Sequence, residues 1–411
     1  MRLCVATEQR FTCTPDRHVW APAGPAYAFW RRYLEVFDEV VVIARTAEIP
    51  TAEPAWNQAD GPGVTFVRVP YFVGAAAYLK KCLQVRSAVR NAVPNMDAVL
   101  MRGASVLTVS LASSLTDGHP FGVEVIGDPY DVFAPGSIEH PLRPALRWWL
   151  TRNLRRQCKK ACAVAYVTQH TLQARYPNAR EAFGTSYSSI ELPDHAFVKA
   201  PRCFALNSHH PVRIITVGSL EQMYKGIDVL IDALAVCQSW DRKVELTIIG
   251  EGRCRPKLET QARNRKLEHA VTFMGQLRTK TKIAELLDNS DLFVLASKTE
   301  GLPRAMVEAM ARGLPCIGTA VGGIPELLSK EDLVASGDAI ALARKIVQVV
   351  REPGRMDRMA VNNLNTAHKY TDSVLAPRRR EFLKHLCQVT RSWKSSLVVS
   401  GRAPMTNVLS N

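Results

Sequence analysis

Short apolar runs alternate with helical patterns along both halves of the chain, and this alternation limits the folds that the chain can adopt. In the first half the runs predict strands at residues 3–6, 40–44, 64–69, 98–101, 122–126 and 163–168. In the second half they predict strands near Ile214, Leu246, Val271, Leu292 and Cys316. Strands that alternate with helices are typical of parallel sheets covered by helices. The pattern therefore predicts an α/β protein with two Rossmann-like, doubly wound domains.

The length of 411 residues supports two domains, each large enough to bury a core of its own. We place the first domain at residues 1–195 and the second at 212–371, with a polar linker at 196–211 between them. Ligands bind outside the carboxyl ends of parallel strands, so we expect the two domains to face a central cleft. The polar residues 400–411 are predicted to form a flexible tail.

The segment from Glu300 to Pro315 predicts a turn that leads into a helix. Pro303 suits the first helical position, where its missing N–H costs nothing, and Gly313 followed by Pro315 ends the helix. The amides of residues 301–305 would then point out of a helix N-terminus, which is a site for a phosphate. Glu308, inside the helix, is placed to accept hydrogen bonds from two neighbouring hydroxyls. A nucleotide sugar offers both groups, although a capped surface helix with two acids has the same pattern.

Cysteine usage and the start of the chain bear on the compartment. The ten cysteines show no paired zinc-ligand motif, and several lie inside apolar runs, as reduced core cysteines do. The first residues predict a strand and not a signal peptide. No stretch approaches the roughly 18 apolar residues that span a bilayer. We therefore expect a cytoplasmic protein that does not cross a membrane.

Several glycine turns in the second half follow predicted strands at regular places. The turns lie at Gly218, Gly250, Gly275 and Gly322, and Lys225 follows the first of them. The Glu300 segment is a further motif in the same half. The order and spacing of these motifs resemble the nucleotide-sugar-binding half of retaining GT-B glycosyltransferases of the GT4 (glycosyl transferases group 1) family. That family includes capsule, exopolysaccharide and lipopolysaccharide enzymes. The resemblance covers about residues 212–371 well and is weak over the first 200 residues.

The resemblance implies a role for individual residues. Glu308 would hold the ribose hydroxyls and Lys225 the diphosphate. Glu300 would hold the ring of the donor sugar and is a catalytic candidate. Taken alone, Lys225 also fits a solvated residue at the start of a helix. The other donor-binding residues would be Gly218, Gly275, Gly301, Leu302, Pro303 and Arg304. A C-terminal helix at about 372–390 would cross back and complete the first domain.

The resemblance also implies a reaction without a protein nucleophile or a cofactor. The sugar would be transferred with retention of configuration, and the leaving phosphate would take the proton of the acceptor. The chain contains no Asp-x-Asp metal motif, so we expect no metal. A helix N-terminus and basic side chains would compensate the charge of the leaving group instead.

Two positions depart from the pattern of the family. Ser219 stands where relatives often carry a basic residue, so charge compensation would rest on Lys225, the amides and Arg304. Many relatives present a histidine toward the donor sugar, and the corresponding stretch here is residues 123–133. Asp128 is the catalytic candidate in place of that histidine. A turn-forming Asp before Pro129 is the alternative interpretation.

The net charge of +15 is unevenly distributed. Between residues 140 and 180 there is no Asp or Glu, while nine Lys or Arg occur. A helical pattern in this stretch places Arg152, Arg155 and Lys159 with Trp148, opposite an apolar face. An exposed Trp among cations predicts contact with an anionic membrane surface. The alternatives are a basic face paired with acids elsewhere and binding of nucleic acid, and no nucleic-acid module is recognisable.

These observations predict a retaining glycosyltransferase of the hexosyltransferase type. It would move a sugar from a nucleotide sugar to a saccharide acceptor, lipid-linked, in cell-surface polysaccharide synthesis. It would associate peripherally with the inner face of the cell membrane and bind no nucleic acid. A transferase with a soluble acceptor, such as a sugar phosphate or a glucan, and a degenerate sugar-binding protein are the alternatives.

Overall fold

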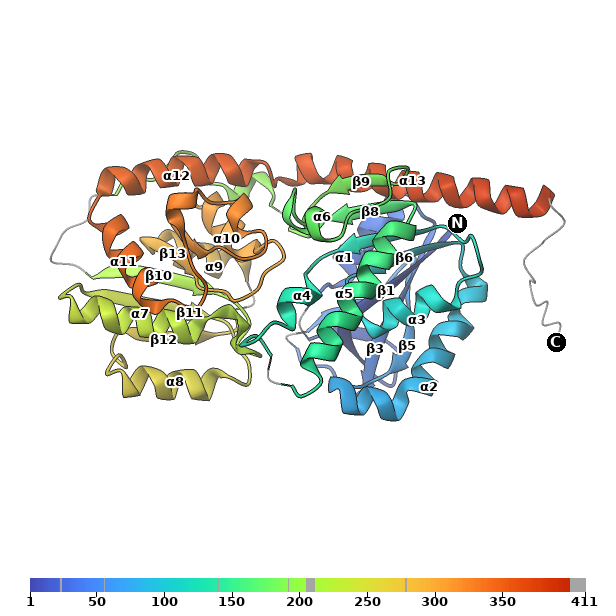
Figure 1. The fold of residues 1–411 in the computed structure, drawn as a ribbon, viewed down its shortest axis with the longest axis horizontal. Helices are drawn as coiled ribbons and strands as arrows, with labels where there is room; N and C mark the ends of the chain where they lie inside the picture. Colours follow the sequence, from blue (N-terminus) through green and yellow to red (C-terminus); the bar gives the residue numbers. More distant parts are fainter. Residues whose placement is uncertain are drawn as a thin grey trace.

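The structure is a computed structural model that describes residues 1–22, 24–54, 56–138, 140–190, 192–204, 211–277 and 279–399. Two α/β domains lie side by side along the longest axis (Figure 1). The predicted tail at 400–411 and the centre of the predicted linker, 205–210, lie outside the described residues. Within the described residues, no helix is long and apolar enough to cross a bilayer.

The sheet of the first domain is mostly parallel, in the order β5-β3-β1-β6-β7-β8-β9. These strands are β1 Arg2–Cys13, β3 Glu39–Glu48, β5 Val64–Pro70, β6 Ala98–Arg102, β7 Phe121–Val125, β8 Ala163–Tyr166 and β9 Phe183–Ser186. Two short strands, β2 Val19–Ala21 and β4 Asn57–Gln58, extend the sheet with antiparallel pairing next to β1.

Two elements of the first domain differ from the sequence-based prediction. β1 continues beyond residue 6 because its polar second half still pairs with β3, after a register shift between Ala6 and Arg10. The helix predicted at 29–36 is divided into α1 Tyr27–Arg31 and a 3₁₀ helix, Arg32–Glu35. α1 has no side-chain cap and is rich in aromatic residues, which favour a helix only weakly.

Helices cover both faces of this sheet. One face packs against α2 Gly74–Ala92, α3 Val106–Ser114 and α5 Arg143–Lys160. α1 and the C-terminal helix, α13 Asp372–Val399, cover the other face. The short helices α4 Pro129–Val132 and α6 Thr171–Arg175 follow β7 and β8.

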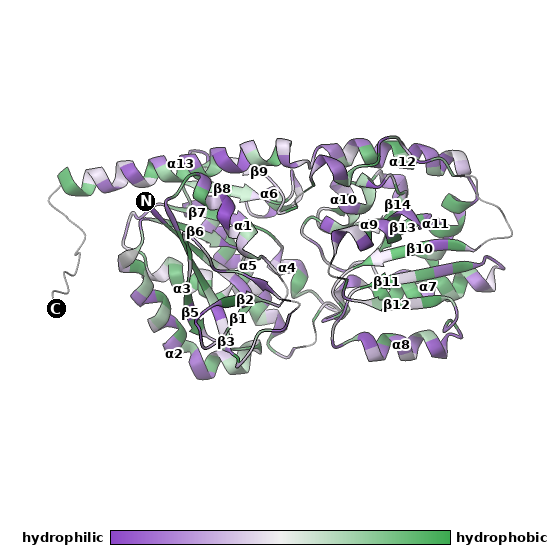
Figure 2. Ribbon diagram, turned by 180° about the vertical axis from the view of Figure 1, so that it is seen from behind, coloured by the Kyte–Doolittle hydropathy of each residue, from purple (hydrophilic) through white to green (hydrophobic). Residues whose placement is uncertain are grey.

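The sheet of the second domain is entirely parallel, in the order β12-β11-β10-β13-β14-β15. Its strands are β10 Val212–Val217, β11 Val244–Ile249, β12 Val271–Gly275, β13 Leu292–Leu295, β14 Cys316–Thr319 and β15 Leu333–Val334. The helices are α7 Ile227–Ser239, α8 Arg255–Asn264, α9 Lys280–Asp288, α10 Arg304–Ala311 and α11 Ala339–Val350. The central strands are apolar and the outer helices mixed (Figure 2), as expected for a sheet buried on both faces.

Two consecutive helices join the domains along one edge. α12 Pro353–His368 lies on the second domain, and α13 runs on across the first (Figure 1). α13 buries apolar residues at spacings of three and four against the ends of β8 and β9: Leu375, Phe382, Leu383 and Leu386. Its end at Val399 lies beyond the predicted end near residue 390.

A single carboxylate of the second domain binds the start of a helix in the first. Glu326 accepts hydrogen bonds from the amides of His170 at 3.0 Å and Thr171 at 2.7 Å, and from that of Gln169. It also accepts one from the Thr171 hydroxyl at 2.7 Å. Burial acts to raise the pKa of Glu326, but these donors together hold it below the ordinary value. The contact places a negative charge at the N-terminus of α6.

Replacing this charge tests how much the contact stabilises the domain arrangement. Because the pKa of Glu326 is lowered on folding, its stabilisation is present above the ordinary pKa of a glutamate and is lost as the pH falls through the folded value. We expect Glu326→Gln to lower the free energy of unfolding by about 1 kcal/mol at pH 7. Urea denaturation at several pH values measures this, with Glu331→Gln as an exposed control. A difference from the parent that persists at pH 3 would contradict the assignment.

Candidate functional site

An opening at the centre of the molecule lies between the two domains. It has a volume of about 490 Å³ and is lined by residues of both. From the first domain come segments at the carboxyl ends of strands, including Arg102, Ile126, Val167 and residues 188–190. From the second come Lys280, Leu302, Arg304 and Glu308. The site thus occupies the place where α/β sheets bind ligands.

The second-domain wall is built around the start of α10. This helix begins at Arg304, so Pro303 is the N-cap and not, as predicted, the first helical residue. Its ψ of 102° is extended, which explains the difference of one position. The first amides of α10 have no acceptor within the helix, and Leu302 and Arg304 line the cleft. Gly301, just before, could not carry a side chain, since a Cβ there would lie 2.6 Å from the carbonyl oxygen of Ile126 in the first domain.

Three of the predicted donor-binding residues form one compact group. The Lys225 ammonium donates to Glu300 at 2.6 Å, and both side chains are largely buried, with 17% and 8% exposed. Ser297 donates its hydroxyl to the same carboxylate oxygen at 2.7 Å. Gly218 lies against the aliphatic part of Lys225, where a Cβ would come within 3.3 Å. Lys225 is therefore a paired, oriented cation and not a solvated helix residue.

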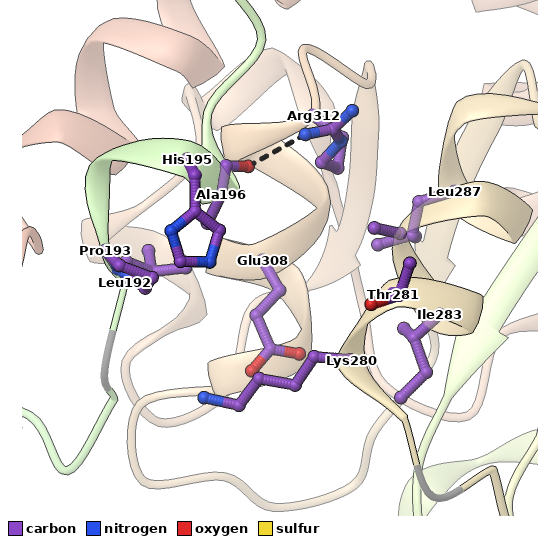
Figure 3. Close-up of a pocket in the computed structure, with 11 residues that line it drawn as sticks. Leu192, Pro193, His195, Ala196, Lys280, Thr281, Ile283, Leu287, Glu308 and Arg312 are labelled. Carbon is purple, nitrogen blue, oxygen red and sulfur yellow. Dashed lines mark hydrogen bonds between the residues drawn. The ribbon is translucent and has the colours of Figure 1, made fainter.

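Glu308 differs from Glu300 because its carboxylate has no hydrogen-bond partner among the described residues. Figure 3 shows it pointing into a pocket of about 220 Å³, toward the side chain of Lys280. His195 and Leu192 line the same pocket. Burial raises the pKa of Glu308, while the charges of Arg304 and Lys280 oppose that rise. A carboxylate in this state is available to accept hydrogen bonds from a ligand.

Gly275 lies apart from this wall. It ends β12 with a φ of +69°, and its carbonyl accepts a hydrogen bond from the Gly250 amide at 2.9 Å. Arg255 and Glu251 lie next to it, and it does not line either pocket described above. No cluster of three His, Cys, Asp or Glu side chains suited to a metal exists among the described residues.

The structure argues against the catalytic role predicted for Asp128. This residue is 2% exposed and caps α4 by accepting from the Tyr130 amide at 2.9 Å. Its carboxylate also forms an ion pair with Arg175 and accepts the hydroxyl of Tyr176. Asp128 does not line the cleft. Of the residues that follow β7, Ile126 lines it. These contacts favour the alternative interpretation, in which the Asp before Pro129 is a turn-forming residue.

The first-domain wall contains a buried ion pair that the sequence analysis missed. Arg102 pairs with Glu124 of β7 and donates to the Ser189 hydroxyl at 2.8 Å. Tyr187 and Tyr33 donate their hydroxyls to Glu124 at 2.7 and 3.1 Å. Burial acts to raise the pKa of Glu124, but the arginines and hydroxyls hold it below its ordinary value. A glutamate inside an apolar strand is a signal of such a pair, although it does not identify the partner.

Comparison with known proteins finds matches to the second half of the chain and to most of its length. Residues 204–366 match the family described as Glycosyl transferases group 1. Protein CapJ of Staphylococcus aureus is 27% identical over 367 residues, 88% of this chain and 90% of that protein. The amylovoran biosynthesis glycosyltransferase AmsK of Erwinia amylovora is 36% identical over 150 residues, 34% of this chain and 36% of that protein.

Among solved structures, HepE of Anabaena in complex with UDP-glucose has a TM-score of 0.63 at 17% identity, over 96% of this chain and all of that one. The fold is GT-B, with two Rossmann-like domains that face a cleft. Together these matches show that the second half of the chain is similar to group 1 glycosyltransferases, among them a glycosyltransferase of amylovoran biosynthesis.

A substitution at Asp128 separates the structural role from a catalytic one. Asp128→Asn removes the charge opposite the partly exposed Arg175, so we expect the free energy of unfolding to fall by about 2 kcal/mol. The affinity for UDP should remain that of the parent. Denaturant unfolding and titration calorimetry measure the two effects. Unchanged stability together with lost activity would restore the catalytic assignment.

Proposed function

We propose that the protein is a retaining glycosyltransferase that uses a nucleotide diphosphate sugar and extends a saccharide. The observation that carries this proposal is the arrangement on α10. Free amides begin the helix, and the unpartnered Glu308 carboxylate follows about one turn, or 6 Å, further along. A phosphate fits the amides, and two ribose hydroxyls fit the carboxylate. A nucleotide presents both groups.

The ion pair beside the start of α10 gives this proposal a mechanism. In the proposed donor complex the diphosphate takes over the Lys225 ammonium, which is a point charge on a flexible side chain. Glu300 keeps its hydrogen bond from Ser297 and accepts a second one from a hydroxyl of the donor sugar. On donor binding, Lys225 would thus exchange Glu300 for the diphosphate, and Glu300 would exchange Lys225 for a sugar hydroxyl. Neither charge would be left without a partner.

The proposed reaction breaks the bond between the anomeric carbon and the phosphate oxygen. The acceptor oxygen forms its bond to the same carbon on the same face, and its proton passes to the departing phosphate. The amides of α10 and Lys225 stabilise the charge that develops on the leaving group, without a metal or a cofactor. This route needs no protein base and no nucleophile. It is consistent with an Asp128 that is buried away from the cleft.

We further propose that the acceptor is lipid-linked and that the protein works at the inner face of the cell membrane. The exposed face of α5 borders a groove of about 640 Å³ that six cations line: Arg143, Arg147, Arg152, Arg155, Arg156 and Lys159. Trp148 is 63% exposed in the same groove, and Arg152 lies over its ring. This combination fits the interface of an anionic bilayer.

A second helix, α2, also supports contact between this side of the first domain and the membrane. α2 packs on the same face of the sheet as α5, and it exposes Leu79 and Leu83 together with Lys80 and Lys81. Neither helix contains an Asp or Glu, nor does α3 between them. Apolar side chains among cations give adsorption both a hydrophobic and an electrostatic part. The helical layer of the first domain would therefore face the lipid.

The function is tested by nucleotide release from a panel of UDP-, GDP- and dTDP-sugars. Each donor is offered with membrane extract, with soluble sugar phosphates or with glucan, in the presence and absence of chelator. Transfer to the lipid fraction without metal is the expected result. Transfer only to a soluble acceptor would replace the lipid-linked proposal, and binding without turnover would indicate a sugar-binding protein.

Two substitutions distinguish the proposed roles in donor binding. Lys225→Met should weaken UDP by about 1–3 kcal/mol and leave uridine almost unaffected, because the lost contact is with phosphate. Glu308→Gln should weaken both ligands by a similar amount, because the lost contact is with ribose. Titration calorimetry measures all four affinities. Equal losses of UDP and uridine in Lys225→Met would contradict the phosphate role.

The membrane proposal predicts a loss of vesicle binding in one triple variant. Replacing Arg152, Arg155 and Lys159 with Gln should reduce partitioning by about two decades, at roughly 1 kcal/mol for each cation. The test is co-sedimentation with anionic vesicles at low and physiological salt.

A second triple variant serves as the control for net charge. It replaces exposed cations on or next to α8 of the other domain, Lys257, Arg263 and Lys266. This variant should bind vesicles like the parent. Equal losses in both triple variants would show that net charge alone, and not α5, drives binding.

A further inference from the structure

Three arginines are buried together behind the first-domain wall of the cleft. Arg32 follows α1, Arg102 ends β6 and Arg379 belongs to α13, and their exposed fractions are 7%, 4% and 4%. The buried carboxylate among them is Glu124, which pairs with Arg102. Asp372 approaches Arg379 only to 3.8 Å, from a position that is 54% exposed. The cluster therefore holds more positive charge than its buried acid compensates.

Much of the hydrogen-bonding capacity of these arginines is unused. All three guanidinium nitrogens of Arg32 are buried without an acceptor among the described residues. The same holds for Nε of Arg102 and for one terminal nitrogen of Arg379. Burial lowers the pKa of Arg32, and the neighbouring cations Arg102 and Arg379 add to this effect. Buried donors on charged groups are costly when unpaired, so such a cluster is suited to a ligand that supplies the acceptors.

The cluster reaches the cleft through two of the residues that line it. Arg102 and Phe29 both belong to the wall. The guanidinium carbons of Arg32 and Arg102 lie 3.6 and 4.6 Å from the centre of the Phe29 ring. Ser189, which binds Arg102, lines the cleft as well. A group that enters beside Ser189 meets Arg102 first. Arg32 lies against the same Phe29 ring as Arg102.

We propose that this cluster recognises an oxyanion, a phosphate or a carboxylate, on the acceptor saccharide. The inference rests on the proposed function. In that proposal the donor binds the second-domain wall, with Glu308, and the acceptor binds the first-domain wall. The oxyanion accepts from the guanidinium of Arg102, which lines the cleft, and compensates the excess charge of Arg32 and Arg379. The acceptor class is then an acidic or phosphate-bearing saccharide and not a neutral glycan.

The test is a binding experiment that needs no turnover. UDP is titrated first, and its failure to bind would count against the proposed function alone. A hexose 1-phosphate, a hexuronate and the neutral hexose are then titrated at constant ionic strength, with and without saturating UDP, which occupies the donor phosphate site. We expect at least one of the two anions to bind about tenfold or more tightly than the neutral hexose. The anion that binds identifies phosphate or carboxylate as the recognised group.

Variants connect this affinity to the cluster. Arg32→Met removes a buried cation without acceptors, so it should weaken the anion about tenfold without lowering the unfolding temperature. Arg102→Lys keeps a cation opposite Glu124 and removes the free Nε donor, so it should weaken the anion as well. Arg156→Met, on the exposed face of α5, is the matched control.

Two results would overturn the inference. One is equal binding of the neutral hexose and both anions by the parent. The other is unchanged anion affinity in both cluster variants, together with a lower unfolding temperature for Arg32→Met. That second result would make the arginines purely structural.

Discussion

The geometry of the cleft depends on the carboxylate of Glu326 and the amides that it binds in the other domain. A charged acceptor against the start of a helix is directional, so it fixes an orientation as well as a distance. The same segment is connected to the donor wall, because the Gly323 amide donates to the Gly301 carbonyl at 2.7 Å. Gly301 immediately precedes the residues that begin α10. One short segment, residues 323–326, therefore contacts both the first domain and the turn that precedes α10.

The carboxylates near the cleft are prepared for different partners. Glu300 and Glu124 are each held by a cation and by hydroxyl donors. A buried acid held in this way keeps one orientation. Glu308 lacks such partners, and burial raises its pKa. It therefore gains most from a ligand that donates hydrogen bonds. Glu300 and Glu124 thus already have protein partners, whereas Glu308 is an open acceptor.

Sequence signals were sufficient where the determinants are local. The helix of residues 304–311 was predicted because Pro303 and Gly313 mark its ends, and Gly313 adopts the positive φ of +67° that such an end requires. The strands of the second domain were predicted because burial on both faces makes them continuously apolar. The class of fold followed from the same alternation of strands and helices.

The determinants that were missed depend on residues far apart in the chain. Arg102 pairs with Glu124 across two neighbouring strands, and no spacing rule connects them. The role of Asp128 is not readable from the sequence, because an Asp before a proline looks alike whether it caps a helix or faces a ligand. The structure adds the partners Arg175 and Tyr176, which no local spacing predicts. The second half of β1 was missed because its pairing with β3, and not its own polarity, makes it a strand.

The path of α13 has a consequence for the synthesis of the protein. The last long helix of the chain returns to cover the first sheet, and it contributes Arg379 to the buried cluster there. A ribosome releases the N-terminal strands early, but their apolar face stays uncovered until almost the whole chain has emerged. The second domain, in contrast, is contiguous and has no such delay. The domain that is made first is thus completed last, and a prematurely terminated chain would retain one half of the cleft without a finished partner.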